Sequence, residues 1–215
     1  MDPDGNLERT DGAKGHMGFV LTRPCETCNN GWMSDLETLV QPVIEPMIRG
    51  QAKTLTFSDC RTAAEWMVKT SIMFEYFQNR TRRYFTRRDR IAIATTRSLP
   101  RMMMFFAHYI PRTEHTSAWF HEYPIPLVMT TERGIIQADA YSATFALGQL
   151  VLQMFTHRYR EPTILFHTPG DWNDASIQTW PNRLGNELHW PPRLLLDEEN
   201  LLLFSKRWAG LKPNA

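Results

Sequence analysis

The stretch SDCRTAAEWMVKTSIMFEYFQN, residues 58 to 79, has the clearest helical pattern in the chain. Its apolar and aromatic residues recur every three or four positions, so they fall on one side of a helix and predict that this side is buried. Ser58 or Asp59 can cap the first turn. The residues of the buried side are Ala63, Trp66, Met67, Thr70, Met73, Phe74 and Phe77.

The pattern changes after Pro100. Short segments rich in β-branched and aromatic residues, separated by turn-forming residues, predict an antiparallel sheet. These segments are RMMMFFAHYI (101–110), SAWFHEYPIPLVM (117–129), GIIQADAYSATF (134–145) and TILFH (163–167). The segment TFALGQLVLQMF (144–155) fits either alternating strands or a helix that aligns Gln149, Gln153 and His157, and we favour the strand.

Three regions are predicted along the chain, and together they predict an α+β protein. Residues 1–17 are polar and without periodicity, which predicts a disordered arm. Residues 18–50 contain a short strand at 19–22, a cysteine knuckle, and a helix up to Gly50 that Ser34 and Glu37 could start as a capping box and that Pro42 and Pro46 should kink or break. Residues 51–215 form the α+β body, with helices within 58–99, mainly β structure over 101–190, and a short C-terminal helix from about Asp197.

Composition restricts the class of protein. The formal net charge is +1, from 24 basic and 23 acidic residues, so the overall charge gives no case for nucleic acid or a membrane surface. Three cysteines are too few for a disulfide framework, which favours a reducing, cytoplasmic setting. No apolar run approaches the roughly 20 residues that a membrane span needs. We therefore expect a soluble protein with no membrane partner.

The only CxxC motif joins Cys25 and Cys28. Two thiolates at this spacing can bind one zinc ion, but they fill only half of its four positions. Cys60 and the seven histidines do not have the spacing that would identify the other ligands. Two alternatives remain, a pair of reduced surface thiols and a redox pair, although the βαβ pattern expected around a thioredoxin-like pair is missing.

The knuckle CETCNNGWMSDLE, residues 25–37, resembles the second half of the HNH, or ββα-metal, endonuclease motif. It is most similar to a group of bacterial and phage HNH-like proteins. The resemblance extends more loosely to the tryptophan-containing helix AAEWMVKTSIMFE (63–75) and to the late WPP at 190–192. It implies DNA as the substrate, structural zinc at Cys25 and Cys28, and Mg²⁺ or another divalent ion for catalysis. Asn29 takes the Asn/His position that contributes to the catalytic metal site, with Asn30 beside it.

The sequence departs from that group in one respect. Members carry a second CxxC and a Glu-His-x-x-Pro segment upstream of the knuckle, which supply the remaining zinc ligands and the catalytic histidine. Residues 1–24 contain neither, and His16 lies in GHMG without the flanking Glu and Pro. We therefore expect impaired cleavage. Either the histidine-bearing half is encoded upstream, or the chain is a degenerate relative that binds without cleaving, and a homodimer or a separate chain could complete the zinc site.

A basic run, RTRRYFTRRDR, occupies residues 80–90. Arg80, Arg82, Arg83, Arg87, Arg88 and Arg90 face a single acid, Asp89. This density predicts phosphate binding, and the interleaved Tyr84 and Phe85 could stack on bases. The alternative is a solvated corner between two helices whose arginines pair with acidic neighbours. Two functions are thus carried forward: an HNH-like DNA-binding protein, and a non-catalytic interaction protein on the same scaffold.

Overall fold

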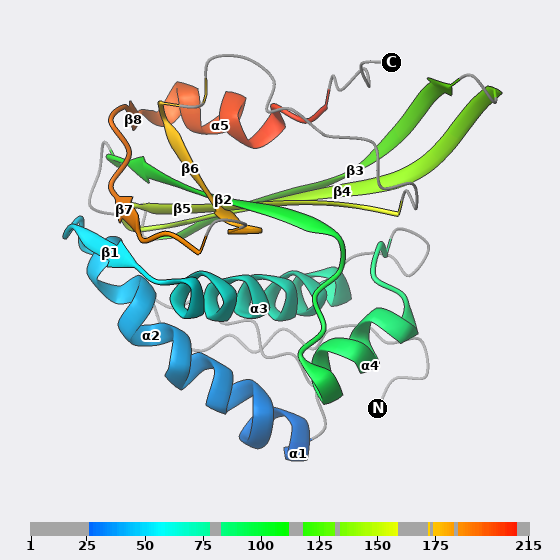
Figure 1. The fold of residues 1–215 in the computed structure, drawn as a ribbon, viewed down its shortest axis with the longest axis horizontal. Coiled ribbons are helices and arrows are strands. Elements are labelled where there is room, and N and C mark those ends of the chain that lie inside the picture. Colours follow the sequence, from blue (N-terminus) through cyan, green and yellow to red (C-terminus); the bar gives the residue numbers. More distant parts are fainter. Residues whose placement is uncertain are drawn as a thin grey trace.

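The computed structural model describes residues 26–77, 83–111, 118–131, 134–158, 172, 174–182 and 185–209. One sheet lies at the centre of the fold, with α2, α3 and α4 on one face and α5 on the other (Figure 1). The predicted α+β class is confirmed. The expected arm at 1–17, the strand at 19–22 and the strand at 163–167 lie outside the described residues.

The large sheet has the strand order β3-β4-β5-β2-β6, and β8 also pairs with β2. All its pairs are antiparallel except β2 with β8. β3 is an edge strand, which is why it can hold Pro124 and Pro126. The strands are β2 (Met102–Tyr109), β3 (Ala118–Thr131), β4 (Gly134–Leu147), β5 (Leu150–His157), β6 (Ser176–Trp180) and β8 (Leu195–Leu196). A separate pair joins β1 (Lys53–Leu55) to β7 (Leu188–Trp190).

The ambiguous segment 144–155 forms the end of β4, a tight turn and β5, so the preference for strands was right. Gly148 makes this turn with φ of +53°. A Cβ atom at this position would lie 2.5 Å from the carbonyl oxygen of Ile48, at the end of α2. Glycine is therefore required both by the backbone angle and by the close approach of the helix.

The long predicted helix is α3 (Phe57–Phe74), which continues as a 3₁₀ turn, η2 (Glu75–Phe77). Its N-cap is Thr56, not Ser58 or Asp59 as expected. The Thr56 side chain accepts from the Asp59 backbone N–H while the Asp59 carboxylate accepts from that of Thr56, a capping box. The prediction was wrong because Asp59 acts as the third residue of the box rather than as the cap.

The knuckle region differs from expectation in two ways. It runs from α1 (Glu26–Cys28) through the irregular turn η1 (Asn29–Met33) directly into α2 (Ser34–Ile48), so Ser34 is already helical and does not cap. α2 also continues through Pro42 and Pro46, and the non-helical residue is Gly31 instead, with φ −98° and ψ −119°. Because Pro46 has no N–H, the Pro42 carbonyl loses its helical donor, and the Lys53 ammonium lies 3.5 Å from it.

The two remaining helices lie where the sequence placed them. α4 (Arg87–Thr96) begins with a capping box between Thr86 and Asp89 and ends at Arg97, which has a left-handed backbone conformation. α5 (Glu198–Lys206) begins at Asp197, whose carboxylate accepts the Asn200 N–H. The predicted helices within 58–99 and at the C-terminal end are therefore confirmed.

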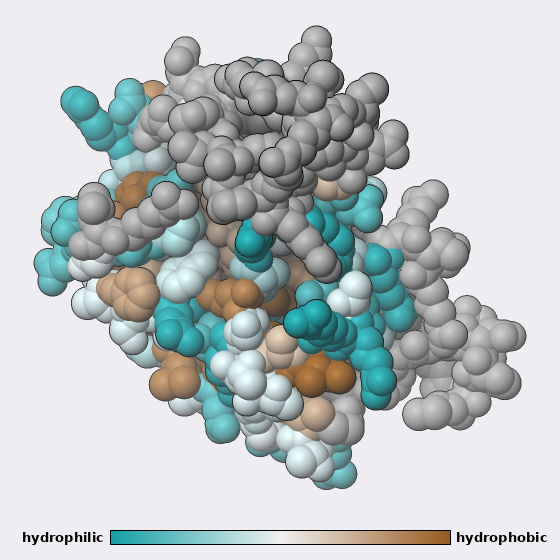
Figure 2. All heavy atoms as spheres, turned by 45° about the vertical axis from the view of Figure 1, so that its right-hand side comes forward, coloured by the Kyte–Doolittle hydropathy of each residue, from teal (hydrophilic) through white to brown (hydrophobic). Residues whose placement is uncertain are grey.

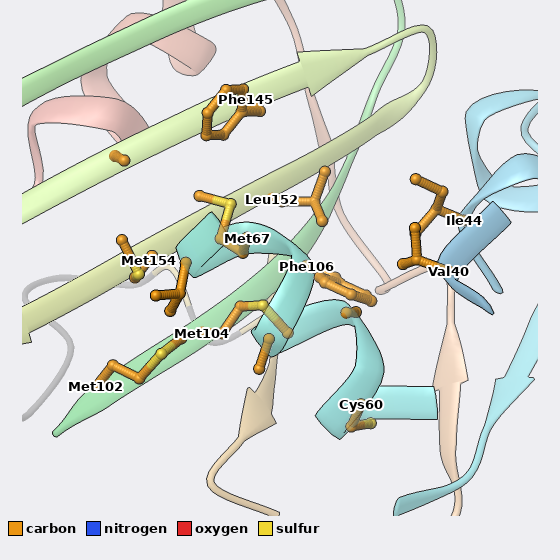
Figure 3. Close-up of a cluster of buried hydrophobic side chains, with 14 of the residues drawn as sticks. Val40, Ile44, Cys60, Met67, Met102, Met104, Phe106, Phe145, Leu152 and Met154 are labelled. Carbon is orange, nitrogen blue, oxygen red and sulfur yellow. The ribbon is translucent and has the colours of Figure 1, made fainter. Parts of the chain in front are cut away.

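Alternation along the strands divides the core in two. Side chains of β2 and β5 such as Met104, Phe106 and Leu152 meet Met67 of α3 and Ile44 of α2 (Figure 3). The alternate residues point to the opposite face and pack under α5. Met102 and Met104 belong to the first core and Met103 to the second, as expected for successive residues of a strand.

A buried polar centre joins the sheet to α5. The Gln153 amide nitrogen of β5 donates to the carbonyl oxygens of Phe204 (2.9 Å) and Ser205 (3.3 Å), and its oxygen accepts from Arg207 Nε (2.6 Å) and Trp208 Nε1 (2.9 Å). Arg207 is 7% exposed and has no carboxylate partner in the described part of the chain. Burial lowers its pKa to about 9, so it stays charged at neutral pH.

Three aromatic rings, and not an acidic side chain, stabilise the charge of Arg207. Its guanidinium carbon lies 4.1 Å from the ring centre of Phe204, 4.3 Å from that of Phe105 and 5.0 Å from that of Trp208. Cation–π contacts of this kind are stronger where water is excluded. Together with the hydrogen bond from Arg207 Nη1 to Ser176 Oγ (3.2 Å), they hold the C-terminal helix against the sheet.

Substituting Gln153→Leu should lower the free energy of unfolding by about 3 kcal/mol or more, because it leaves several buried polar groups without partners, each costing about 1–3 kcal/mol. Urea unfolding measures the change. Gln178→Leu, at an exposed position on β6, is the control and should shift stability by no more than about 0.5 kcal/mol. Equal effects from the two substitutions would contradict the clamping role of Gln153.

Candidate functional site

The residues of the predicted metal site are described only in part. Cys25 lies outside the described residues, and Cys28 is half-buried at the end of α1. Asn29 and Asn30 are exposed, and the Asn29 side chain donates to that of Asn30 at 3.3 Å. Within the described ranges, no group of three or more His, Cys, Asp or Glu side chains is arranged to hold a metal ion. These residues therefore do not supply a complete donor set for zinc or magnesium.

The predicted basic run divides into two kinds of arginine. Arg80 and Arg82 lie outside the described residues. Arg87 and Arg88 are exposed in the first turn of α4 and form no ion pair with any described residue. Arg83 and Arg90 instead lie over the Tyr76 ring, at 4.6 and 5.1 Å from its centre, so they are held in place by α3 and η2.

The expectation that Tyr84 and Phe85 stack on bases is wrong. Phe85 is 3% exposed and belongs to the main core. The Tyr84 ring stacks on Tyr141 of β4 at 5.3 Å, and its hydroxyl lies 3.4 Å from Thr156 Oγ1. Burial raises the pKa of Tyr84 to about 12. Both rings attach the basic segment to the sheet and are not available to a ligand.

Glu75 holds together one corner of the molecule, where the end of α3, η2, residues 83–86 and the start of α4 meet. Its side chain is fully buried, and its carboxylate accepts the backbone N–H groups of Tyr84 (2.5 Å) and Phe85 (3.1 Å). Arg90 lies 3.5 Å from the same carboxylate, and Arg83 donates to the Glu75 carbonyl oxygen at 3.3 Å. Burial raises the pKa of Glu75, although these partners oppose the shift. The sequence held one signal for this role. Glu75 follows Met67 and Ser71 at intervals of four residues, which places an acid on the buried side of α3.

A second acid lies near the first. Tyr141 donates a short hydrogen bond to the Glu122 carboxylate, and burial raises the Tyr141 pKa well above its ordinary value, helped by the charges of Glu122 and Glu75. The neighbouring His121 lies on the opposite face of β3, where its ring packs against Trp119 and Tyr123. His121 and Glu122 therefore do not act as a pair, as the alternation of strand residues predicted.

Asp89 ties α4 to the sheet. Its carboxylate completes the capping box with Thr86 and also accepts from Arg158 Nη2 at 2.9 Å. Arg158 follows β5, lies over the Tyr84 ring at 4.6 Å, and donates to the Tyr84 carbonyl oxygen at 2.5 Å. The one acid in the basic run is thus already paired, which leaves the Arg87 and Arg88 charges uncompensated by it.

A cavity of about 210 Å³ lies beside this corner, between η1, α3 and α4. Its walls are mostly apolar and aromatic, two cations line it, and none of its lining residues is acidic or histidine. The lining residues are Cys28, Trp32, Met33, Lys69, Ile72, Met73, Tyr76, Arg90, Ile93 and Ala94. Figure 2 turns the right-hand side of Figure 1 forward, and the part not in grey shows small brown apolar groups bordered by teal hydrophilic residues.

Trp32 and Lys69 are fixed from outside the cavity. Arg97, which is not a lining residue, lies 4.6 Å from the Trp32 ring centre and donates to the Trp32 carbonyl oxygen at 3.3 Å. Lys69, whose side chain is 6% exposed, pairs at 2.5 Å with Glu37, which is 60% exposed. Trp32 Nε1, Arg90 Nε and Arg97 Nη1 are buried donors without an acceptor. Both cations that line the cavity are therefore paired with carboxylates, Lys69 with Glu37 and Arg90 with Glu75.

No protein-family model, curated protein or solved structure matches this chain. The resemblance to HNH endonucleases therefore depends on the knuckle residues and the looser sequence similarity alone. No helix within the described ranges is long and apolar enough to cross a membrane.

The two acids of this corner should affect the pH dependence of stability in opposite directions. The raised pKa of Glu75 means that the folded protein loses stability as the pH rises from the ordinary carboxyl range through the raised value. For Asp89, burial acts to raise the pKa, but hydrogen bonds from Thr86 and Arg158 lower it overall. Its stabilising contribution is therefore present at neutral pH and is lost as the pH falls through the folded-state pKa.

Urea unfolding between about pH 3 and pH 7.5 tests this, since ordinary carboxyl pKa values are near 4. As the pH rises, the wild-type protein should lose stability relative to Glu75→Gln and gain stability relative to Asp89→Asn. Each variant serves as the control for the other. Two differences that run in the same direction would show that the burial of one of these acids is not as described.

Proposed function

We propose that this corner binds DNA, in a protein that resembles HNH endonucleases but does not cleave DNA with the residues described above. The observation that carries the proposal is that Arg87 and Arg88, two consecutive arginines in the first turn of α4, are exposed and form no ion pair with any described residue. Closely spaced cations of this kind bind DNA phosphates and release counter-ions. The knuckle resemblance gives DNA as the expected ligand.

The position of Arg87 and Arg88 at the start of α4 favours the binding of an anionic ligand. They lie in the first turn of α4, where the partial positive charge of the helix end disfavours a cation by about 0.3–1 kcal/mol. Asp89 in the same turn is engaged by Thr86 and Arg158. A phosphate at this place would be attracted by both arginines and by the helix end. The competing explanation, an arginine corner neutralised by acids, accounts for Arg90 but not for this pair.

Cleavage by this chain is not supported by the corner. Hydrolysis of a phosphodiester requires a base to activate water and a divalent ion to stabilise the phosphate. Asn29 and Asn30 are accessible, but the adjoining cavity has no histidine and residues 1–24 lack the Glu-His pair. Mg²⁺ would then act only with a histidine-bearing half. Structural zinc at Cys25 and Cys28 would need ligands from a second copy or a separate chain, and a cytoplasmic setting is part of the same proposal.

A second candidate function is a non-catalytic interaction protein. Leu202 and Leu203 of α5 are exposed, as are Leu194 and Leu195 at β8, which packs next to that helix. Exposed apolar residues that gather on one face are typical of protein-binding surfaces. This candidate predicts a partner protein or a second copy at α5 and does not require the basic corner.

The double substitution Arg87→Ala/Arg88→Ala should weaken binding of a duplex oligonucleotide at least fivefold. Loss of two phosphate contacts should also reduce the slope of log K against log salt by about 2. Fluorescence anisotropy over a salt series measures both quantities. Arg193→Ala, an exposed arginine beyond β7, is the control and should leave both unchanged. Unaltered affinity and slope in the double variant would rule out this corner as the DNA site.

The purified chain should not nick supercoiled DNA in the presence of Mg²⁺ or Mn²⁺, because residues 1–24 lack the Glu-His pair expected to supply the general base and no histidine lines the cavity next to η1. Gel analysis of plasmid DNA measures this, and Asn29→Ala is the matched variant. Metal-dependent nicking by the wild type that disappears in Asn29→Ala would contradict the proposal and establish catalysis. Nicking that persists in the variant would indicate a contaminating nuclease.

A further inference from the structure

The outer side of α5 presents one stripe of exposed side chains. Residues three, four and seven positions apart lie on the same side of a helix. Two leucines form the middle of the stripe, with exposed fractions of 44% for Leu202 and 59% for Leu203, whereas Leu201 and Phe204 are buried on the inner side of the helix. Exposed leucines next to each other on a helix whose inner side is already packed indicate a second contact surface. The stripe consists of Glu199, Leu202, Leu203 and Lys206.

The apolar surface at the centre of this stripe continues beneath α5. Leu202 lines a cavity of about 210 Å³ together with Tyr109 of β2 and Trp119 of β3. No cation is among the described residues that line it, and Glu198 is the one charged residue among them. An apolar side chain that contacts Leu202 from outside would therefore meet further apolar surface beside it.

The two ends of the stripe carry charges of opposite sign. Glu199 lies in the first turn of α5 and Lys206 in the last. Both are exposed, and neither forms an ion pair with any described residue. They lie about 10 Å apart along the helix axis, and the point midway between them falls between Leu202 and Leu203. The helix dipole favours an acid at the start and a base at the end, but it does not account for the two leucines between them.

This arrangement makes the stripe complementary to itself. A two-fold axis perpendicular to α5 at the midpoint places a second α5 antiparallel to the first. Glu199 then faces Lys206 of the second copy, and Leu202 faces its Leu203, so that every contact occurs twice. A parallel arrangement would instead bring like charges together, and a partner with charges of one sign would be repelled at one end of the stripe. Charge complementarity therefore favours a second copy over a uniformly acidic or basic partner.

We infer that the chain forms a homodimer through α5, with the two helices antiparallel. The inference rests on the second candidate function, an interaction surface at α5, and names a second copy as the partner; it does not require DNA binding at α4. The stripe is short, so the dimer should be weak and should dissociate on dilution. The knuckle packs on the other face of the sheet (Figure 1), so this dimer would keep the two knuckles apart and would not complete a zinc site.

Charge reversal tests the antiparallel arrangement. Glu199→Lys alone and Lys206→Glu alone should each be monomeric, because each variant has like charges facing each other at both ends of the stripe. An equimolar mixture of the two variants should form a heterodimer, since every positive position then faces a negative one. Sedimentation velocity at about 2–200 µM measures the dimer fraction, and the wild type should change from monomer to dimer over this range. Circular dichroism checks that each variant is folded.

The leucines are tested by Leu203→Gln, which should weaken the wild-type dimer by about tenfold or more. The effect is large because the two-fold axis removes the apolar contacts of two leucines at once. Leu39→Gln is the matched control, since Leu39 is an exposed leucine of α2, on the other face of the sheet (Figure 1). This control should leave the dissociation constant unchanged.

The outcomes separate the homodimer from the proposed functions. A wild-type chain that stays monomeric at all these concentrations would overturn the inference, and the second candidate function would then need a different protein as its partner. A wild-type dimer would lie at another surface if the mixed charge variants stay monomeric or if Leu203→Gln dimerises equally well. DNA binding is measured separately with Arg87→Ala/Arg88→Ala, so its loss with an intact dimer would refute only the corner at α4.

Discussion

The corner of this molecule depends on one buried carboxylate. Glu75 lies where α3 gives way to its terminal turn, and it accepts the backbone N–H groups of Tyr84 and Phe85. Those two contacts return the chain to the sheet after the segment beyond Phe77, and Arg90 brings α4 to the same carboxylate. A buried charge is costly unless it is paired and hydrogen-bonded, and these partners supply that compensation. Contacts with the buried Glu75 therefore fix the positions of Arg83 and Arg90.

On the opposite face of the sheet, the buried charge is positive. There the buried ion is the Arg207 guanidinium, which is held by a neutral amide and three rings rather than by an acid. Gln153 can serve both ends of this arrangement because its amide has donors for the α5 carbonyls and an acceptor for Arg207 and Trp208. Each face of the sheet thus has one polar centre that fixes a helix in position.

Local patterns predicted the elements well. The 3.6-residue period of 58–79, the alternation after Pro100 and the helix start near Asp197 each describe a short segment, and each is found in the structure. The caps expected at Ser34 and at Ser58 or Asp59 were local errors, and the remaining errors concern partners that lie far away in sequence. Pro42 and Pro46 do not break α2, because packing and a contact from Lys53 compensate for the missing donors. Tyr84 and Phe85 point inward because of Glu75 and Tyr141, and nothing in the basic run itself indicates this.

The side chains of the knuckle differ in how firmly the rest of the structure supports them. Asn29 and Asn30 came from a motif, and the structure leaves them exposed with only each other as side-chain partners among the described groups. Trp32, two residues further on, was expected to pack the knuckle onto the following helix; it lines the cavity and lies under Arg97, the residue that ends α4. A group that is rigidly supported before any ligand arrives costs less to engage than one that must be ordered on binding. By this criterion Trp32 is the best-supported side chain that the knuckle contributes to the cavity.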